Sequence, residues 1–269
     1  MESLNIALVA VDLDGTLVRG DGVAREDVSA LAQAIENGVI VCIATGRPDK
    51  SARMVLEQIG LGDLPIISFN GAMVKVPGTD EPLLHLTMPL ELAREVVSTA
   101  VQERWHLHYF IGDDCYVSRM SKMAWVYWRR TGIRPIPVGD LRKVATREPT
   151  KIILVEEPER VNQIGPEMMR RWGDKLYVAR SRPDIVEIVN PSVNKGMALV
   201  KLSEHLGIPI AKTLALGDAT NDAPLIEAAG IGVAMPDSDP EVMALADVIL
   251  EDSEAPVADA IRQLVLRGS

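Results

Sequence analysis

The sequence Leu8-Val9-Ala10-Val11-Asp12-Leu13-Asp14-Gly15-Thr16-Leu17 decides the fold. Its short apolar run, which contains β-branched residues, predicts a buried strand that ends at Asp12. Asp12 and Asp14 then lie at the carboxyl end of that strand, which is the edge of a parallel sheet where ligands bind. Two carboxylates so close repel each other. A divalent cation that prefers oxygen ligands, such as Mg²⁺, or a shared proton can compensate the repulsion.

Two simpler interpretations compete with a cation site of this kind. The string Asp-x-Asp-Gly also occurs in EF-hand loops, but those need a preceding helix and a Glu near the loop's end, where this chain has Val23. The aspartates could also merely cap main-chain amides in a turn. The stretch alone leaves that alternative open, and the rest of the chain argues against it.

Composition argues against several kinds of partner. The 269 residues, of which 47% are hydrophobic, can bury the core of one large domain or two smaller ones. A net charge of −10 provides no basic field for nucleic acid or for an anionic membrane surface. Residues 1–5 do not resemble a targeting segment, and no run approaches the ~20 apolar residues of a membrane span. We therefore expect a cytoplasmic monomer or homodimer with Cys42 and Cys115 as reduced thiols.

The outer thirds of the chain alternate strands with helices. Strands are predicted at residues 6–12, 39–45, 65–70, 213–216, 231–235 and 248–250. Helices are predicted at residues 26–36, 48–59, 194–206, 223–229, 240–246 and 257–266. This alternation predicts right-handed crossovers and an α/β fold with a doubly wound, Rossmann-like parallel sheet covered on both faces.

The middle of the chain differs in its pattern of predicted elements and in its aromatic content. Short paired strands alternate with helices there, and all four tryptophans and all four tyrosines fall within residues 84–189. Such a concentration of large aromatic side chains indicates a separate hydrophobic core. We predict a discontinuous core domain of residues 1–83 and 190–269 that is interrupted by an inserted α+β domain of residues 84–189.

Four polar clusters lie at predicted strand ends or at a helix start. They are Asp12-Leu13-Asp14-Gly15-Thr16, Thr45-Gly46-Arg47, Asn194-Lys195-Gly196 and Gly217-Asp218-Ala219-Thr220-Asn221-Asp222. The first and last can bring three carboxylates together on adjacent strands, which suffices for one Mg²⁺ that keeps some water ligands. The second and third offer a hydroxyl group, a glycine amide and an ammonium group, which suit a phosphate dianion. Each cluster alone is a weak signal, because most such residues are ordinary loop or surface residues.

In this order the four clusters resemble the motifs of the haloacid dehalogenase (HAD) superfamily of phosphohydrolases. The chain is most similar to the Cof-like sugar-phosphatase branch, which has a large α/β cap between the second and third motifs. The resemblance covers nearly the whole chain, and Asn70-Gly71-Ala72 is similar to that branch's Asn-Gly-Ala. Ala223-Pro224-Leu225 lacks the branch's Met, and Pro236-Asp237-Ser238 replaces its Gly-Asn-Ala. These departures leave the substrate specificity open.

The resemblance implies a Mg²⁺-dependent phosphatase that acts on a small phosphorylated metabolite, such as a sugar phosphate. Asp12 would be the nucleophile that forms an aspartyl-phosphate, and Asp14 would be the general acid and then the general base. For that role the pKa of Asp14 would have to rise by ~2 to 3 units from ~3.9. Mg²⁺ would be held by Asp12, Asp218 and the main-chain carbonyl of Asp14.

The resemblance also implies which residues bind the substrate phosphate. The predicted set is Thr45, Gly46, Arg47, Asn70, Lys195 and Asn221. Asp222 would support Lys195 and the metal without binding the metal directly. Two rival functions remain open: a phosphotransferase or phosphomutase that uses the same aspartyl-phosphate, and a non-catalytic protein that binds a phosphorylated ligand.

Two pairs outside the motifs have ordinary interpretations. His106 and His108 could face one side of a strand as metal ligands, but no third ligand is near, so we expect core or exposed histidines. Trp125 and Trp128 have helical spacing, which favours a place in the core of the inserted domain or in a subunit contact over a sugar-stacking platform.

Overall fold

A computed structural model describes residues 5–20 and 22–266 of the chain. Residues 1–4, on which the expectation about targeting partly depends, lie outside the described residues. The chain divides into two compact units: a discontinuous core unit, Met1–Leu84 with Asn194–Ser269, and a cap unit, His85–Val193. The sequence placed the boundaries after residues 83 and 189. Among the helices of the described residues, none has the length and apolar character to span a membrane.

The core unit is built on an eight-stranded sheet in the order β14-β13-β12-β1-β2-β3-β4-β5. Its strands are β1 (Leu8–Val11), β2 (Ile40–Ala44), β3 (Ile66–Ser68), β4 (Met73–Lys75), β5 (Leu84–His85), β12 (Thr213–Gly217), β13 (Ile231–Ala234) and β14 (Val248–Ile249). The six strands from β14 to β3 run parallel, and β4 is antiparallel to β3. Val11 at the end of β1 pairs with Leu216 of β12 and with Ile43 of β2, so these three strands end side by side.

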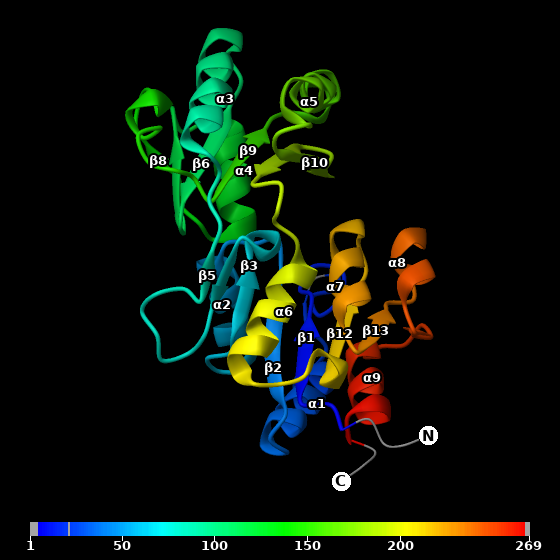
Figure 1. The fold of residues 1–269 in the computed structure, drawn as a ribbon. Helices are drawn as coiled ribbons and strands as arrows, with labels where there is room; N and C mark the ends of the chain where they lie inside the picture. The colour runs from blue at the N-terminus through cyan, green and yellow to red at the C-terminus, as the bar shows by residue number, and fades with distance from the viewer. Residues whose placement is uncertain (1–4, 21, 267–269) are drawn as a thin grey trace. The chain divides into compact units, whose positions relative to one another are not determined.

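Helices cover both faces of this sheet (Figure 1). They are α1 (Arg25–Glu36), α2 (Asp49–Ile59), α6 (Lys195–Leu206), α7 (Ala223–Ala228), α8 (Pro240–Leu245) and α9 (Pro256–Leu264), with the 3₁₀ turns η1 (Phe69–Gly71), η3 (Ile210–Lys212) and η4 (Thr220–Asp222). Val9 and Val11 of β1 pack with α1, α2 and α9, whereas Leu8 and Ala10 pack with α6, α7 and α8. Because successive residues of a strand point to opposite faces, one apolar strand supports both layers. The predicted doubly wound fold is confirmed.

The cap unit contains a six-stranded sheet in the order β10-β11-β9-β6-β7-β8. Its strands are β6 (Leu107–Ile111), β7 (Asp114–Val117), β8 (Ile136–Pro137), β9 (Lys151–Val155), β10 (Tyr177–Arg182) and β11 (Ile185–Val189). Its helices are α3 (Leu90–Glu103), α4 (Lys122–Thr131) and α5 (Pro158–Trp172), and η2 spans Leu141–Lys143. All neighbours are antiparallel except β7 and β8. α3 and α5 share one apolar cluster with the sheet, which gives the cap unit its own core.

Helix α4 packs on the opposite face of the cap sheet. The ring of Tyr127 lies 4.7 Å from that of His108, which alternates along β6 with the residues that face α3 and α5. Trp125 lies on the outer side of α4, is 51% exposed and contacts Trp128, with ring centroids 4.8 Å apart. Of the two places that the sequence favoured for Trp125, the cap core is therefore wrong, because Met123, Ala124 and Tyr127 occupy the inner side of the helix. The other, a subunit contact, stays a prediction.

The two histidines of β6 are buried, which is one of the two outcomes that the sequence favoured. His106 Nε2 lies 3.0 Å from Ser121 Oγ, and His108 Nδ1 lies 3.5 Å from Cys115 Sγ. Burial, assisted by the charge of Arg119, lowers the pKa of His106 to about 4. Burial also lowers the pKa of His108 well below its ordinary value. Both rings are therefore neutral in the native protein near pH 7.

The cap unit should lose stability in acid because of these histidines. An unfolded histidine takes up a proton near pH 6.5, whereas native His106 does so only near about 4. The unfolded state therefore binds more protons between these values, and stability falls as the pH drops through this window. Tryptophan fluorescence measures unfolding of the cap unit selectively, because all four tryptophans lie in it. His106→Gln should reduce the pH dependence of the melting temperature, and an unchanged dependence would contradict this account.

Candidate active site

The predicted catalytic residues come together at the carboxyl edge of the core sheet. Asp12 follows β1, and its amide donates to the carbonyl of Leu216 at 3.0 Å. Asp218 follows β12, and Thr45 follows β2, where its amide donates to Ile67 O at 2.8 Å. Since β12, β1 and β2 are parallel neighbours, three segments that are far apart in sequence contribute to one site.

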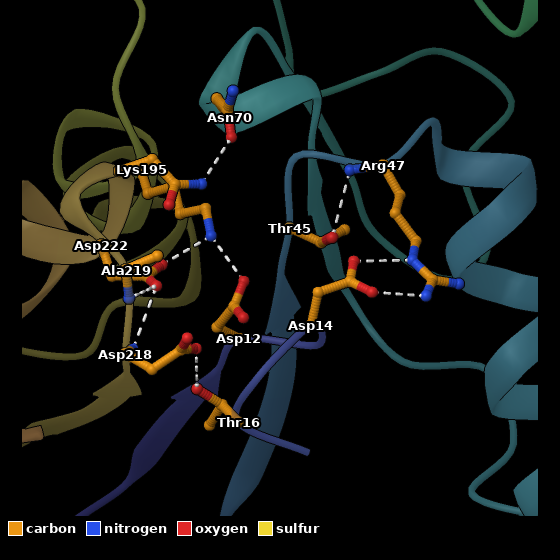
Figure 2. Close-up of polar contacts among 11 residues, drawn as sticks. Asp12, Asp14, Thr16, Thr45, Arg47, Asn70, Lys195, Asp218, Ala219 and Asp222 are labelled. Carbon is orange, nitrogen blue, oxygen red and sulfur yellow. Dashed lines mark hydrogen bonds and ion pairs between the residues drawn. The ribbon is translucent and has the colours of Figure 1, made fainter. Parts of the chain in front are cut away.

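A buried ammonium group lies at the centre of this site. Lys195 Nζ donates to Asp12 Oδ1 and to Asp222 Oδ1, both at 2.6 Å (Figure 2). Lys195 is fully buried at the first position of α6, whose N-cap Asn194 accepts a hydrogen bond from the amide of Met197 at 2.7 Å. The capped helix start therefore fixes the point from which the lysine side chain reaches the two carboxylates.

Asp222 also organises the loop that carries Asp218. Its second oxygen, Oδ2, accepts hydrogen bonds from the amides of Asp218 and Ala219 at 3.2 and 3.1 Å. Both oxygens of Asp222 are thus used inside the protein. The supporting role of Asp222 towards a metal stays a prediction.

The cluster carries more negative than positive charge. Burial raises the pKa of Asp12 well above its usual range, the charge of Asp222 raises it further, and Lys195 opposes the rise. Burial raises the pKa of Asp218 to about 6. Burial by itself lowers the pKa of an ammonium group, but the charges of Asp12 and Asp222 raise the pKa of Lys195 above its ordinary value. Lys195 therefore stays protonated and compensates only part of the charge of the three carboxylates.

The acidic cluster fits a divalent cation. Carboxylate oxygens of Asp12, Asp218 and Asp222 lie within 4.8 Å of one another. In residues 5–20 and 22–266, no hydrogen bond reaches Oδ2 of Asp12 or Oδ2 of Asp218. Carboxylate oxygens are hard donors of the kind that Mg²⁺ prefers, and a cation would compensate the excess negative charge. The acidic cluster is therefore suited to a divalent cation.

Thr16 is a site residue to which the sequence assigned no role. Its buried hydroxyl donates to Asp218 Oδ1 at 2.8 Å, across a sequence separation of 202 residues. Gly15 beside it has φ +98°, and an added Cβ would collide with the carboxylate of Asp218. Thr16 belongs to the first sequence motif, but its contact with Asp218 could not be predicted from the sequence, because it depends on β1 and β12 being neighbours in the sheet.

Arg47 and Asp14 form a second ion pair at the same edge (Figure 2). Arg47 Nε donates to Asp14 Oδ2 at 2.8 Å, and Nη2 donates to Asp14 Oδ1 at 2.6 Å. The Asp14 side chain is half exposed, so its carboxylate does not join the acidic cluster. The Arg47 amide donates to Thr45 Oγ1 at 3.1 Å, which leaves the hydroxyl hydrogen of Thr45 available for a ligand.

The remaining predicted residues lie in a third group. Asn221 Nδ2 donates to Asn70 Oδ1 at 3.0 Å, across 151 residues of sequence. Asn70 has φ 59°, a left-handed conformation that Asn tolerates better than most residues. A Cβ on Gly46 would lie 2.8 Å from Asn70 Oδ1, so this amide side chain lies directly against the Thr45-Gly46-Arg47 loop.

The doubly wound fold with this acidic edge defines a class of phosphoryl-transfer enzymes, and comparison with known proteins agrees. Residues 9–261 match the family described as haloacid dehalogenase-like hydrolases. The chain is 31% identical over 242 residues to the 5-amino-6-(5-phospho-D-ribitylamino)uracil phosphatase of Bacillus subtilis, covering 85% of this chain and 86% of that protein. It is 29% identical over 247 residues to the HMP-PP phosphatase of Cronobacter sakazakii, covering 88% and 86%.

A solved structure supports the same conclusion. The crystal structure of a protein from Thermotoga maritima matches with a TM-score of 0.87 and 25% identity, covering 96% of this chain and 97% of that one. The chain belongs to the family of haloacid dehalogenase-like hydrolases. Within that family it is a Cof-like phosphatase, which hydrolyses phosphoric monoesters, as the sequence predicted.

Removing the central ammonium group should destabilise the core unit strongly. Lys195→Met leaves Asp12 and Asp222 facing each other without a counter-charge, and loss of one member of a buried ion pair costs about 3–5 kcal/mol. Urea denaturation of the variant and the native chain measures this difference. Lys201→Met is the matched control on α6, because Lys201 is 54% exposed and pairs only with Glu204 in the described structure. It should cost less than about 1 kcal/mol, and equal losses in the two variants would contradict the account.

Proposed function

We propose that the enzyme hydrolyses the phosphate monoester of a small metabolite through an aspartyl-phosphate on Asp12. The observation that carries the proposal is the way Asp12 is held. Lys195 Nζ donates a hydrogen bond to Asp12 Oδ1 at 2.6 Å, whereas Asp12 Oδ2 has no hydrogen-bond partner in the described structure. A carboxylate that is fixed through one oxygen and presents the other at a ligand-binding edge is suited to attack phosphorus.

We propose Mg²⁺ as the cofactor. Asp12 and Asp218 would hold the ion with the main-chain carbonyl of Asp14, which stays a prediction. When bound, the ion supplies charge neutralisation that allows an anionic phosphate to approach an anionic nucleophile. Thr16 and Asp222 hold Asp218 and its loop in place for this role.

The other site residues act on the phosphoryl group and on protons. The Thr45 hydroxyl, the Gly46 amide and Lys195 are the proposed donors to the phosphoryl oxygens. Asp12 Oδ2 bonds to phosphorus while Asp14 gives its proton to the departing oxygen. Asp14 then takes a proton from the water that attacks the aspartyl-phosphate, which releases inorganic phosphate and restores both aspartates.

The names of the relatives guide the choice of substrates. The Bacillus subtilis relative is a phosphatase for 5-amino-6-(5-phospho-D-ribitylamino)uracil, and the Cronobacter sakazakii relative is an HMP-PP phosphatase. We infer that this enzyme also acts on a small phosphorylated metabolite, such as a sugar or polyol phosphate. We further propose that the cap unit, inserted in the chain between Asn70 and Lys195, supplies the specificity.

Phosphate release from a panel of phosphorylated metabolites tests the proposed function. The panel contains sugar and polyol phosphates, 5-amino-6-(5-phospho-D-ribitylamino)uracil and p-nitrophenyl phosphate. The native chain should release phosphate with Mg²⁺ and stop when EDTA is added. Asp12→Asn keeps the shape of the nucleophile without its charge and should lower turnover roughly 10⁴-fold.

Three results would count against the proposal. Equal rates in EDTA and Mg²⁺ would exclude the cofactor, and an active Asp12→Asn variant would exclude the nucleophile. Transfer of phosphate to an added alcohol with little inorganic phosphate released would favour the phosphotransferase alternative.

Calorimetry tests the metal site without measuring turnover. Titration of the native chain with MgCl₂ should show one binding event, and Asp218→Asn should weaken it roughly 10-fold or more. Asp63→Asn is the matched control, because it removes one negative charge from an exposed carboxylate that pairs with Arg53. Equal affinities of the two variants would argue against the proposed ligand set.

A further inference from the structure

Positive charge is concentrated in one stretch of the cap unit. Residues 115–139 contain no aspartate or glutamate, although the whole chain has a net charge of −10. The cations of this stretch are Arg119, Lys122, Arg129, Arg130 and Arg134. Lys122 pairs with Glu157, and Arg130 pairs with Asp184. No ion pair engages the other arginines of the stretch in the described structure, so uncompensated positive charge remains at the surface.

The outer side of α4 combines this charge with exposed apolar surface. Trp125 and Val126 are exposed, and the ring of Trp125 contacts that of Trp128. The guanidinium carbon of Arg134 lies 5.2 Å from the centroid of the Trp128 ring. Arg129 follows Trp125 by four residues and is therefore its neighbour on the helix surface. We call these five residues the basic face. Tryptophan and arginine are enriched among the residues that dominate binding energy at protein interfaces.

The opposite charge pattern occurs at one edge of the core sheet. Residues 213–261 contain no lysine or arginine. Within this range, β14 is the last strand in the order of the described sheet and pairs there with β13. The exposed residues along β14 and its flanks, which we call the acidic edge, are Leu245, Asp247, Ile249, Glu251, Asp252 and Glu254. An edge strand with exposed apolar side chains is open to contact with another chain.

The basic face and the acidic edge complement each other in two respects. Their charges are opposite, and each surface also presents exposed apolar side chains, such as Trp125 on one and Ile249 on the other. Within the described structure, no ion pair engages Glu251 or Glu254. Opposite charges that lie within about 10 Å attract each other despite physiological salt, and burial of the apolar side chains adds to this attraction. One chain therefore carries both halves of a contact that it can make with a second copy.

A second copy fits the basic face better than an extended anion does. A membrane surface or a nucleic acid would also face the rest of the chain, which is more negative than the whole because residues 115–139 contribute only positive charge. Such a partner would be repelled over most of the protein surface. The acidic edge of another copy presents negative charge over a small area and includes apolar side chains that tryptophan can cover.

We propose that the protein forms a two-fold dimer in which the basic face of each chain docks on the acidic edge of its partner. A two-fold axis makes this contact twice, because the second contact repeats the first with the two chains exchanged. A standard protein interface buries about 1,600 Å² in total, so each of the four surfaces has to supply only about 400 Å². A short helix can therefore suffice.

Reversal of charge tests each surface separately. The first variant combines Arg129→Glu with Arg134→Glu, and the second combines Glu251→Lys with Glu254→Lys. In sedimentation velocity, the native chain should dimerise reversibly, with a dissociation constant that rises with salt concentration. Each variant alone should raise this constant at least about 100-fold, because like charges then face each other in both contacts.

Mixing the two variants tests whether the surfaces contact each other. In a mixed dimer, the reversed α4 of one chain meets the reversed edge of the other, and the second contact pairs two native surfaces. Opposite charges therefore meet in both contacts. An equimolar mixture should form dimers although neither variant does so alone, and this recovery also shows that both variants are folded.

Three further variants separate the apolar contribution from general surface effects. Trp125→Ala should raise the dissociation constant roughly 10-fold or more, as expected for a tryptophan at the centre of an interface. Met169→Ala is its matched control, because Met169 is an exposed apolar residue of α5 outside both surfaces. Arg170→Glu is the matched charge reversal on the same helix. Both controls should dimerise like the native chain.

Each outcome decides the question. Loss of the dimer in both charge-reversed variants and its recovery in the mixture support the proposal. A native chain that stays monomeric at the highest concentration, a native dissociation constant in either charge-reversed variant, or a mixture that stays monomeric would overturn it. A monomer that binds anionic phospholipid vesicles or a polyglutamate peptide, and loses this binding with Arg129→Glu and Arg134→Glu, would assign the basic face to another partner and also overturn the dimer.

Discussion

The ammonium group of Lys195 is the interaction on which the rest of the core unit depends. It is fully buried and lies 2.6 Å from a carboxylate oxygen of Asp12 and of Asp222. An ion without a counter-charge in such a place costs several kcal/mol, so each of the three groups requires the other two. These contacts join the end of β1, the start of α6 and the turn η4. The same contacts leave one oxygen of Asp12 available at the sheet edge for chemistry.

The approach of α6 to its neighbours follows from this requirement. A Cβ on Gly196 would collide with the main-chain oxygen of Pro224 at the start of α7, and one on Gly71 would collide with that of Asn194. Glycine at these two positions lets the backbone come close enough for Lys195 to reach its partners. The cap unit ends at Val193, immediately before this helix. The chain thus returns to the core unit at Asn194, the N-cap of the helix that begins with Lys195. The inserted cap unit therefore ends before the residues that position this lysine.

The same chemical pair, a cation and a carboxylate, occurs twice at this edge in different surroundings. The pair of Lys195 and Asp12 is buried, so opening it is expensive and the Asp12 side chain stays in place. The pair of Arg47 and Asp14 is partly exposed, so opening it costs little. In the proposed mechanism Asp12 attacks phosphorus and Asp14 gives up and regains a proton, so a fixed side chain suits the first role and a more easily released one suits the second.

The sequence by itself determined the doubly wound core, the inserted α+β segment, the presence of Asp12 and other polar residues at strand ends, and that of Lys195 at a helix start. These features follow from local periodicity and from residue types at the ends of predicted elements. Only the tertiary structure decided that Thr16 holds Asp218 and that Arg47 holds Asp14. It also decided that Trp125 faces outward. The physical reason is that such contacts depend on which strands are neighbours and on the direction in which each side chain points. The local sequence around two residues that lie as many as 202 positions apart contains no information about either.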